Sequence, residues 1–98
     1  MKHHCYYVSI LECSDNTYYT GVTNNLNRRI EEHQNGVNNN SYTHNRRPIQ
    51  LAFSAEFNNI EVAIAKEKQI KKWSRNKKGA LINGDFDLLP GLSKKKFD

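Results

Sequence analysis

Two short segments near the N-terminus alternate hydrophobic and polar residues in the manner of β-strands. In residues 7–12, successive side chains would point to opposite faces of a strand. Residues 13–17 are polar and have the composition of a turn, and residues 18–22 form a second strand-like run. This order predicts a β-hairpin.

A helical pattern follows the predicted hairpin. Leu26, Ile30 and His33 recur at the spacing of one helix face, and residues 23–25 offer side chains that can cap its N-terminus. Gly36 stands where a glycine commonly ends a helix. We therefore expect a helix between these two boundaries.

The pattern changes twice more before the next helix. Residues 37–48 show little periodicity and are typical of a surface loop, which would carry Arg46 and Arg47. Residues 49–57 alternate well enough for a third strand.

Two helices are predicted after the third strand. Asn58 or Asn59 can cap the first, over residues 60–73, and Ser74 can cap a shorter one that ends near Gly84.

The element order ββαβαα is that of an α+β domain with a small three-stranded antiparallel sheet flanked by helices. A chain of 98 residues suits one domain, which we assign to residues 1–84. Residues 85–98 form a tail, and its leucines either pack back on the domain or stay loose.

Composition narrows the class of protein. No apolar run approaches the roughly 18 residues that a membrane-spanning helix needs, and the N-terminus lacks the apolar stretch of a secretory signal. The two cysteines, Cys5 and Cys13, allow one intramolecular disulfide at most. We expect a cytoplasmic protein that is not associated with a membrane.

The net charge of +5 is unevenly distributed. Ten of the fifteen Lys and Arg residues lie after residue 60, and seven of these fall between Lys66 and Lys78. Such a cluster gives a positive potential suited to a phosphate backbone, although a solvated helix face has the same composition. The candidate nucleic-acid contacts are Arg28, Arg46, Arg47, Lys68, Lys71, Lys72, Arg75 and Lys78.

Polar residues of the hairpin and the first helix are candidates for one site. Tyr19 and Gly21 directly precede the helix that carries Arg29 and His33. A glycine lets a ligand approach the backbone closely, and residues four apart lie on one helix face. Cross-strand packing is the ordinary explanation for strand tyrosines.

Glu67 is anomalous because it falls in an apolar row. The row of the predicted helix that recurs at three- and four-residue steps comprises Ile60, Ala63, Ile64, Glu67, Ile70 and Trp73. A carboxylate in that row needs a partner, since an unpaired buried charge is very costly. Either Glu67 pairs with a nearby Lys or Arg, or it is an oxygen ligand of Mg²⁺, which takes one or two carboxylates and keeps waters. Trp73 is expected in the core, with base stacking as the alternative.

The order and spacing of these motifs resemble the GIY-YIG nuclease superfamily, in particular its small stand-alone bacterial branch and the nuclease domain of the excision-repair incision subunit. The resemblance extends from about residue 4 to residue 83. It is carried by Tyr7-Val8-Ser9, Tyr19-Thr20-Gly21, residues 25–33 (NLNRRIEEH), Pro48 before a strand, and residues 67–75 (EKQIKKWSR).

The resemblance implies a ββαβα core, cleavage of nucleic acid, and one divalent ion, Mg²⁺ or Mn²⁺. It matches Tyr19 and Gly21 with the second signature, and Arg29 with the arginine that stabilises charge on the scissile phosphate. It also matches Glu67 with the metal ligand, and His33 with a frequent histidine of variable role.

One position departs from the family pattern. The first signature normally ends in a tyrosine, often assigned to activate the attacking water, and here that position is Ser9. Tyr7 is two residues earlier, hence on the same strand face, and could fill part of the space. The family's distal asparagine has no clear match.

Three hypotheses follow for the function. The first is a non-specific or structure-specific endonuclease that uses Glu67, Arg29 and Tyr19, with Tyr7 or His33 assisting. The second is a nucleic-acid-binding module attenuated by Ser9. A zinc site at His3, His4, Cys5 and Cys13 is the third, and it lacks the paired cysteine spacing of such sites. We expect a monomer that prefers DNA over RNA, and a separate protein partner for specificity stays open.

Overall fold

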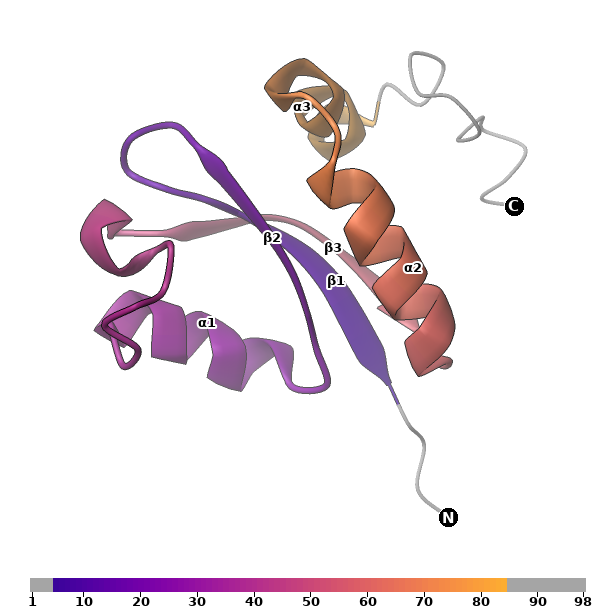
Figure 1. Cartoon of the computed structure of the whole chain (residues 1–98), viewed down its shortest axis with the longest axis horizontal. Coiled ribbons are helices and arrows are strands. Elements are labelled where there is room, and N and C mark those ends of the chain that lie inside the picture. The colour runs from indigo at the N-terminus through magenta and orange to yellow at the C-terminus, as the bar shows by residue number, and fades with distance from the viewer. Residues whose placement is uncertain (1–4, 85–98) are drawn as a thin grey trace.

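The computed structural model describes residues 5–84 and contains a three-stranded sheet with helices on both of its faces (Figure 1). The elements in chain order are β1 (Tyr6–Glu12), β2 (Tyr18–Thr23), α1 (Leu26–Asn35), a 3-10 turn η1 (His44–Arg46), β3 (Gln50–Phe57), α2 (Ile60–Lys71) and α3 (Arg75–Asn83). The predicted α+β class and the ββαβαα order are therefore confirmed. The predictions for the tail and for His3 and His4 concern residues outside this range.

The sheet has the order β2-β1-β3, and both pairings are antiparallel. The central strand places Ile10 opposite Thr20 of β2 and opposite Phe53 of β3. A register irregularity follows between Ile10 and Leu11 on the β3 side. Because directly opposed residues of neighbouring strands point to the same side of a sheet, Thr20 and Phe53 share the face of Ile10.

Each face of the sheet has its own hydrophobic cluster. Val8 and Ile10, both fully buried, pack with Ala63 and Ile70 of α2 and with Leu81 of α3. On the other face, Leu11, Cys13 and Ile49 pack with Ile30 of α1 and with Tyr19. Helices on both faces explain why β1 is buried continuously from Val8 to Leu11.

The predicted helix boundaries agree with the caps that the structure shows. Asn25 accepts a hydrogen bond from the backbone N–H of Arg28 and so caps α1. Asn59 caps α2 and Ser74 caps α3 in the same manner. Among residues 5–84, no helix is long and apolar enough to cross a lipid bilayer.

The buried face of α2 differs from the row expected from the sequence. Ile60 and Ile64 are 39% and 36% exposed, whereas Ala63, Glu67 and Ile70 are buried. The sheet covers only a narrow stripe of this helix, so positions 63, 67 and 70 face it and the isoleucines beside them remain partly in solvent. The helix also ends at Lys71, two residues early, and Trp73 packs on the core.

The segment 37–48 is more than a surface loop, contrary to expectation. Thr43 within it is fully buried, and the chain forms the short turn η1 directly afterwards. Arg46 pairs with Asp15 at 3.0 Å and donates to the carbonyl of Tyr42. Arg47 donates to the carbonyls of His44 and Gln34. Hydrogen bonds along the segment therefore hold it against α1 and the hairpin turn.

Gly36→Ala is expected to lower the free energy of unfolding by about 1–2 kcal/mol, because Gly36 has a φ of +65° and a side chain there is strained. A Cβ would also lie 2.5 Å from Nη1 of Arg47, but the end of that side chain can move away. Urea unfolding of Gly36→Ala and of Gly36→Ala/Arg47→Ala measures both effects. Recovery in the double variant would assign the loss to the arginine rather than to the backbone.

Candidate functional site

A small pocket between α1 and the hairpin is lined by four of the five candidate catalytic residues. Ser9 and Tyr19 reach it from the sheet, Arg29 and His33 from α1, and Gly21 lies in its wall. Ser9 and Gly21 are direct partners across β1 and β2. The odd-numbered face of the hairpin and one side of α1 therefore form this surface together.

Tyr19 is fixed by aromatic neighbours on two sides. Its ring lies 5.2 Å from the His33 ring, centroid to centroid, and stacks on Tyr42 at 5.8 Å with an interplanar angle of 19°. The Arg46 guanidinium covers Tyr42 at 3.9 Å. Sequence reasoning missed Tyr42, since the only signal was an aromatic residue inside a polar segment.

Arg29 has only a weak partner in the described part of the chain. Its Nη1 lies 3.4 Å from Oε1 of Glu32, and the two side chains are 45% and 39% exposed. The Glu32 carboxylate also pairs with Arg28, whose Nε lies 3.9 Å from Oε2. Exposed ion pairs of this kind contribute roughly 0–1 kcal/mol, so the guanidinium can exchange Glu32 for a phosphate at little cost.

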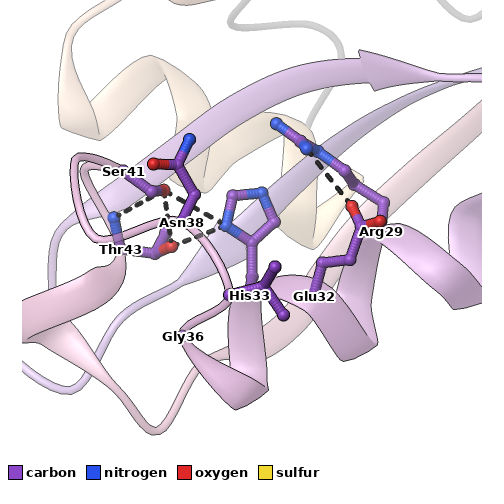
Figure 2. A pocket seen from close by; sticks show the side chains of 8 residues that line it. Arg29, Glu32, His33, Gly36, Asn38, Ser41 and Thr43 are labelled. Carbon is purple, nitrogen blue, oxygen red and sulfur yellow. Dashed lines mark hydrogen bonds and ion pairs between the residues drawn. The ribbon is translucent and has the colours of Figure 1, made fainter.

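His33 lines this pocket and also a second depression between α1 and the 37–48 segment, and only 5% of it is exposed. Figure 2 shows its ring between the Arg29 side chain and the loop residues Ser41 and Thr43. Burial, and then the positive charge of Arg29, lower the pKa of His33 below its usual 6.5, while Glu32 acts weakly in the opposite sense. The ring is therefore neutral near pH 7.

Ser9, which the resemblance matches with the tyrosine of the first signature, is 5% exposed. Tyr7 does not fill the space beside it, contrary to expectation. It borders a separate depression with Asn24 and Asn25 at the start of α1. The charge of Glu56 raises the pKa of Tyr7, which makes its phenol harder to deprotonate.

Glu67 stands apart from this pocket. It is 9% exposed on the α2 side of the sheet, and its Oε2 lies 3.3 Å from Nζ of Lys71. In the described part of the chain, Glu67 lines neither depression that Arg29 borders. Glu67 therefore does not converge with Arg29 and Tyr19, which the endonuclease hypothesis assigns to the same reaction, because α1 and α2 pack on opposite faces.

The candidate nucleic-acid contacts differ in how accessible they are. Lys68, Lys71, Lys72 and Arg75 are exposed along α2 and α3. Lys78 is 9% exposed, and burial lowers the pKa of its ammonium, with Lys71 adding to the effect. It is thus placed in the core rather than on the basic surface. Arg46 and Arg47 are occupied by contacts within the fold.

The zinc hypothesis finds no support among residues 5–84, where no three His, Cys, Asp or Glu side chains gather. Cys5 donates to the Glu56 carboxylate, while Cys13 is buried in the α1-side cluster. Both are free thiols.

The fold and these motifs define a nuclease-type domain. The family model of the GIY-YIG catalytic domain matches residues 5–80, and the chain belongs to this family. Among its relatives, a UPF0213 protein of Syntrophus aciditrophicus is 45% identical over 78% of this chain and 87% of its own length. A UPF0213 protein of Clostridium perfringens is 46% identical over 79% and 82%.

A solved structure supports the same assignment. The solution NMR structure of a UPF0213 protein from Bacillus halodurans matches with a TM-score of 0.54 and 39% identity, over 81% of this chain and 83% of that one. Membership of the family indicates nuclease activity in general, and nucleases of this family generally depend on a divalent metal ion.

The donor set of the chain fits such an ion through one residue. Glu67 offers a hard carboxylate oxygen of the kind that Mg²⁺ or Mn²⁺ binds, at a position that is 9% exposed and on the face of the sheet opposite Arg29. Lys71, 58% exposed, can move away from it. When bound, the ion would supply Lewis-acid polarisation of a phosphate oxygen.

Proposed function

We propose that this protein is a metal-dependent endonuclease that hydrolyses nucleic-acid phosphodiesters with low sequence specificity. The observation that carries the proposal is the weakly held guanidinium of Arg29, which borders the same pocket as Tyr19 and His33. A cation beside two groups able to orient water and accept a proton is the equipment for phosphoryl transfer to water.

The proposed reaction begins with a phosphodiester bound to Arg29 by two charge-assisted hydrogen bonds in place of Glu32. Water attacks phosphorus and gives a proton to the neutral imidazole of His33, with the Tyr19 hydroxyl orienting it. The bond from phosphorus to the leaving oxygen breaks, and that oxygen takes a proton from solvent. Arg29 holds the charge that accumulates on the other phosphate oxygens.

The remaining parts of the proposal concern binding and the metal. Glu67 is the proposed metal ligand, and the exposed lysines of α2 together with Arg28 and Arg75 hold the strand through its phosphates. No base-reading element stands out among the described elements, so we expect little sequence preference. We also propose a monomer and a preference for DNA over RNA.

A second candidate function is supported by Ser9. A serine reaches less far than a tyrosine, and Tyr7 borders another depression. The chain would then bind nucleic acid but cleave it slowly or not at all.

A plasmid-nicking assay with Mg²⁺, with Mn²⁺ and with EDTA tests the proposal, alongside a panel of structured DNAs and RNAs. Nicking that depends on the metal supports the nuclease. A gel shift that weakens with salt, without nicking by the wild type, would support the binding module instead.

Ser9→Tyr is expected to raise the nicking rate, by about tenfold or more, since a general acid–base group contributes on the order of 10²–10⁴-fold. The matched control is Ser54→Tyr, because Ser54 is the β3 partner of Ser9 and is exposed. Rates of supercoil loss and melting temperatures are measured for both. An equal increase in the two variants would exclude a specific role for position 9.

A further inference from the structure

The buried ring of His33 is hydrogen-bonded to residues of the 37–48 segment rather than to residues of its own helix. Nδ1 lies 2.5 Å from Oγ1 of Thr43 and 3.5 Å from Oγ of Ser41. The two hydroxyl oxygens are 3.0 Å apart, and Ser41 also accepts the backbone N–H of Thr43. Thr43 itself is fully buried. A fixed pair of hydroxyl groups therefore faces one side of the imidazole.

The other ring nitrogen has no such partner. Nε2 of His33 is buried and lacks a hydrogen-bond partner among residues 5–84. In Figure 2 it lies on the side of the ring turned toward the Arg29 guanidinium, away from Thr43. The buried nitrogen without a partner thus faces the cation of the proposed phosphate site.

These surroundings favour one tautomer of the neutral ring. A neutral imidazole carries its proton on one nitrogen and a lone pair on the other. The positive charge of Arg29 favours a lone pair over an N–H group at Nε2. The proton then resides on Nδ1, which donates a hydrogen bond to Oγ1 of Thr43, and the Thr43 hydroxyl can in turn donate a hydrogen bond to Oγ of Ser41.

We propose that Thr43, supported by Ser41, is a positioning residue that holds His33 as the Nδ1–H tautomer and leaves its Nε2 lone pair facing Arg29. In that state Nε2 can take the proton of the attacking water, while the other proton stays on Nδ1 and remains hydrogen-bonded to Oγ1 of Thr43. This last step rests on the proposed function, whereas the tautomer depends only on the groups around the ring.

The charged and titratable groups near the ring come from three elements. Arg29 and Glu32 lie on α1, Tyr19 on β2, and Ser41 and Thr43 present neutral hydroxyls from the loop. An acceptor at Nδ1 stabilises the imidazolium, whose two nitrogens both carry protons. A donor at Nδ1 would stabilise the neutral ring instead. The effect of removing Thr43 on the pKa of His33 therefore reveals the direction of the bond.

The experiment is ¹⁵N NMR of the histidine rings during a pH titration of the wild type, Thr43→Val and Thr43→Ser. We expect Nδ1–H in the wild type, a shift toward Nε2–H with a lower His33 pKa in Thr43→Val, and retention of the wild-type pattern in Thr43→Ser. Thr20→Val is the control, since Thr20 is a buried threonine of the opposite face whose hydroxyl has no partner in residues 5–84.

A wild-type spectrum with the proton on Nε2 would overturn the proposal without any variant, and so would a raised His33 pKa in Thr43→Val. In the nicking assay, Thr43→Val should lower kcat on the order of tenfold with KM unchanged, part of what a general base contributes. If the wild type shows the expected tautomer but never cleaves nucleic acid, the positioning role of Thr43 is supported and the proposed nuclease function is refuted. Failure of one proposal can therefore be distinguished from failure of the other.

Discussion

Replacing Arg29 by alanine is expected to lower kcat for phosphodiester cleavage by about 10²–10³-fold, the range found when one charge-stabilising donor is removed from an active site. Arg29 lies beside both Tyr19 and His33 and is tied only to an exposed carboxylate. Its charge is therefore available where negative charge accumulates on the phosphate. Stability should change little, because exposed ion pairs contribute roughly 0–1 kcal/mol.

Arg28 is the matched comparison for this variant. It precedes Arg29 on α1, is 63% exposed and approaches the same Glu32, but it borders neither pocket that Arg29 borders. Arg28→Ala should act through strand binding, raising KM and leaving most of kcat. Arg29→Lys should fall between wild type and Arg29→Ala, since an ammonium keeps the charge without the planar fork. Equal kcat losses for Arg28→Ala and Arg29→Ala would contradict a specific role for Arg29.

Arg29→Ala should also change the pH dependence of kcat in a defined direction. Burial lowers the pKa of His33 and the charge of Arg29 lowers it further, so removal of Arg29 should raise this pKa toward 6.5 and move the acidic limb of the kcat profile to higher pH. For folding, a depressed His33 pKa means that the unfolded chain binds more protons below pH 6.5. The stability contributed by the neutral ring is complete above that pH and is lost as pH falls through the folded pKa.

Replacing Glu67 by glutamine is expected to abolish most metal-dependent nicking, with a loss of about 10²-fold or more if the carboxylate holds the ion. Glutamine keeps the shape of the side chain between Ala63 and Ile70 and removes only its charge. Lys71 is largely exposed and can then be solvated. The melting temperature should therefore stay close to that of the wild type.

Glu61→Gln is the control, because Glu61 is an exposed carboxylate at the start of the same helix. Titration of activity with Mn²⁺ measures the apparent metal affinity of each variant. A Glu67→Gln protein that loses stability but keeps its metal response would mean that the pair with Lys71 is structural. Such a result would agree with the position of Glu67 on the face of the sheet opposite Arg29.

The elements of this fold could be predicted because their signals are local. Alternation along the first two strands depends on the period of the chain itself, and Asn25, Asn59 and Ser74 cap helices through hydrogen bonds to residues two or three positions away. Gly36 ends α1 through its own backbone angle. The motif order then identified the family. These features need no knowledge of what packs against them.

The composition of the site depended on contacts that no local pattern contains. The hydroxyl of Thr43 reaches His33 from ten residues away, and Tyr42 meets Tyr19 across a loop without periodicity. Ser9 faces the pocket while Tyr7 borders another one, although both lie on one strand face.

The sequence by itself determined the secondary structure, the family and the concentration of positive charge near the C-terminus, since each follows from the order and spacing of residues. Only the tertiary structure decided which side of the sheet each helix covers. That choice joins Arg29 with Tyr19 and His33 and places Glu67 on the opposite side. The physical reason is that a helix gains stability by burying apolar surface on either face of the sheet. Which helix packs on which hydrophobic cluster is therefore decided by the packing of the whole chain.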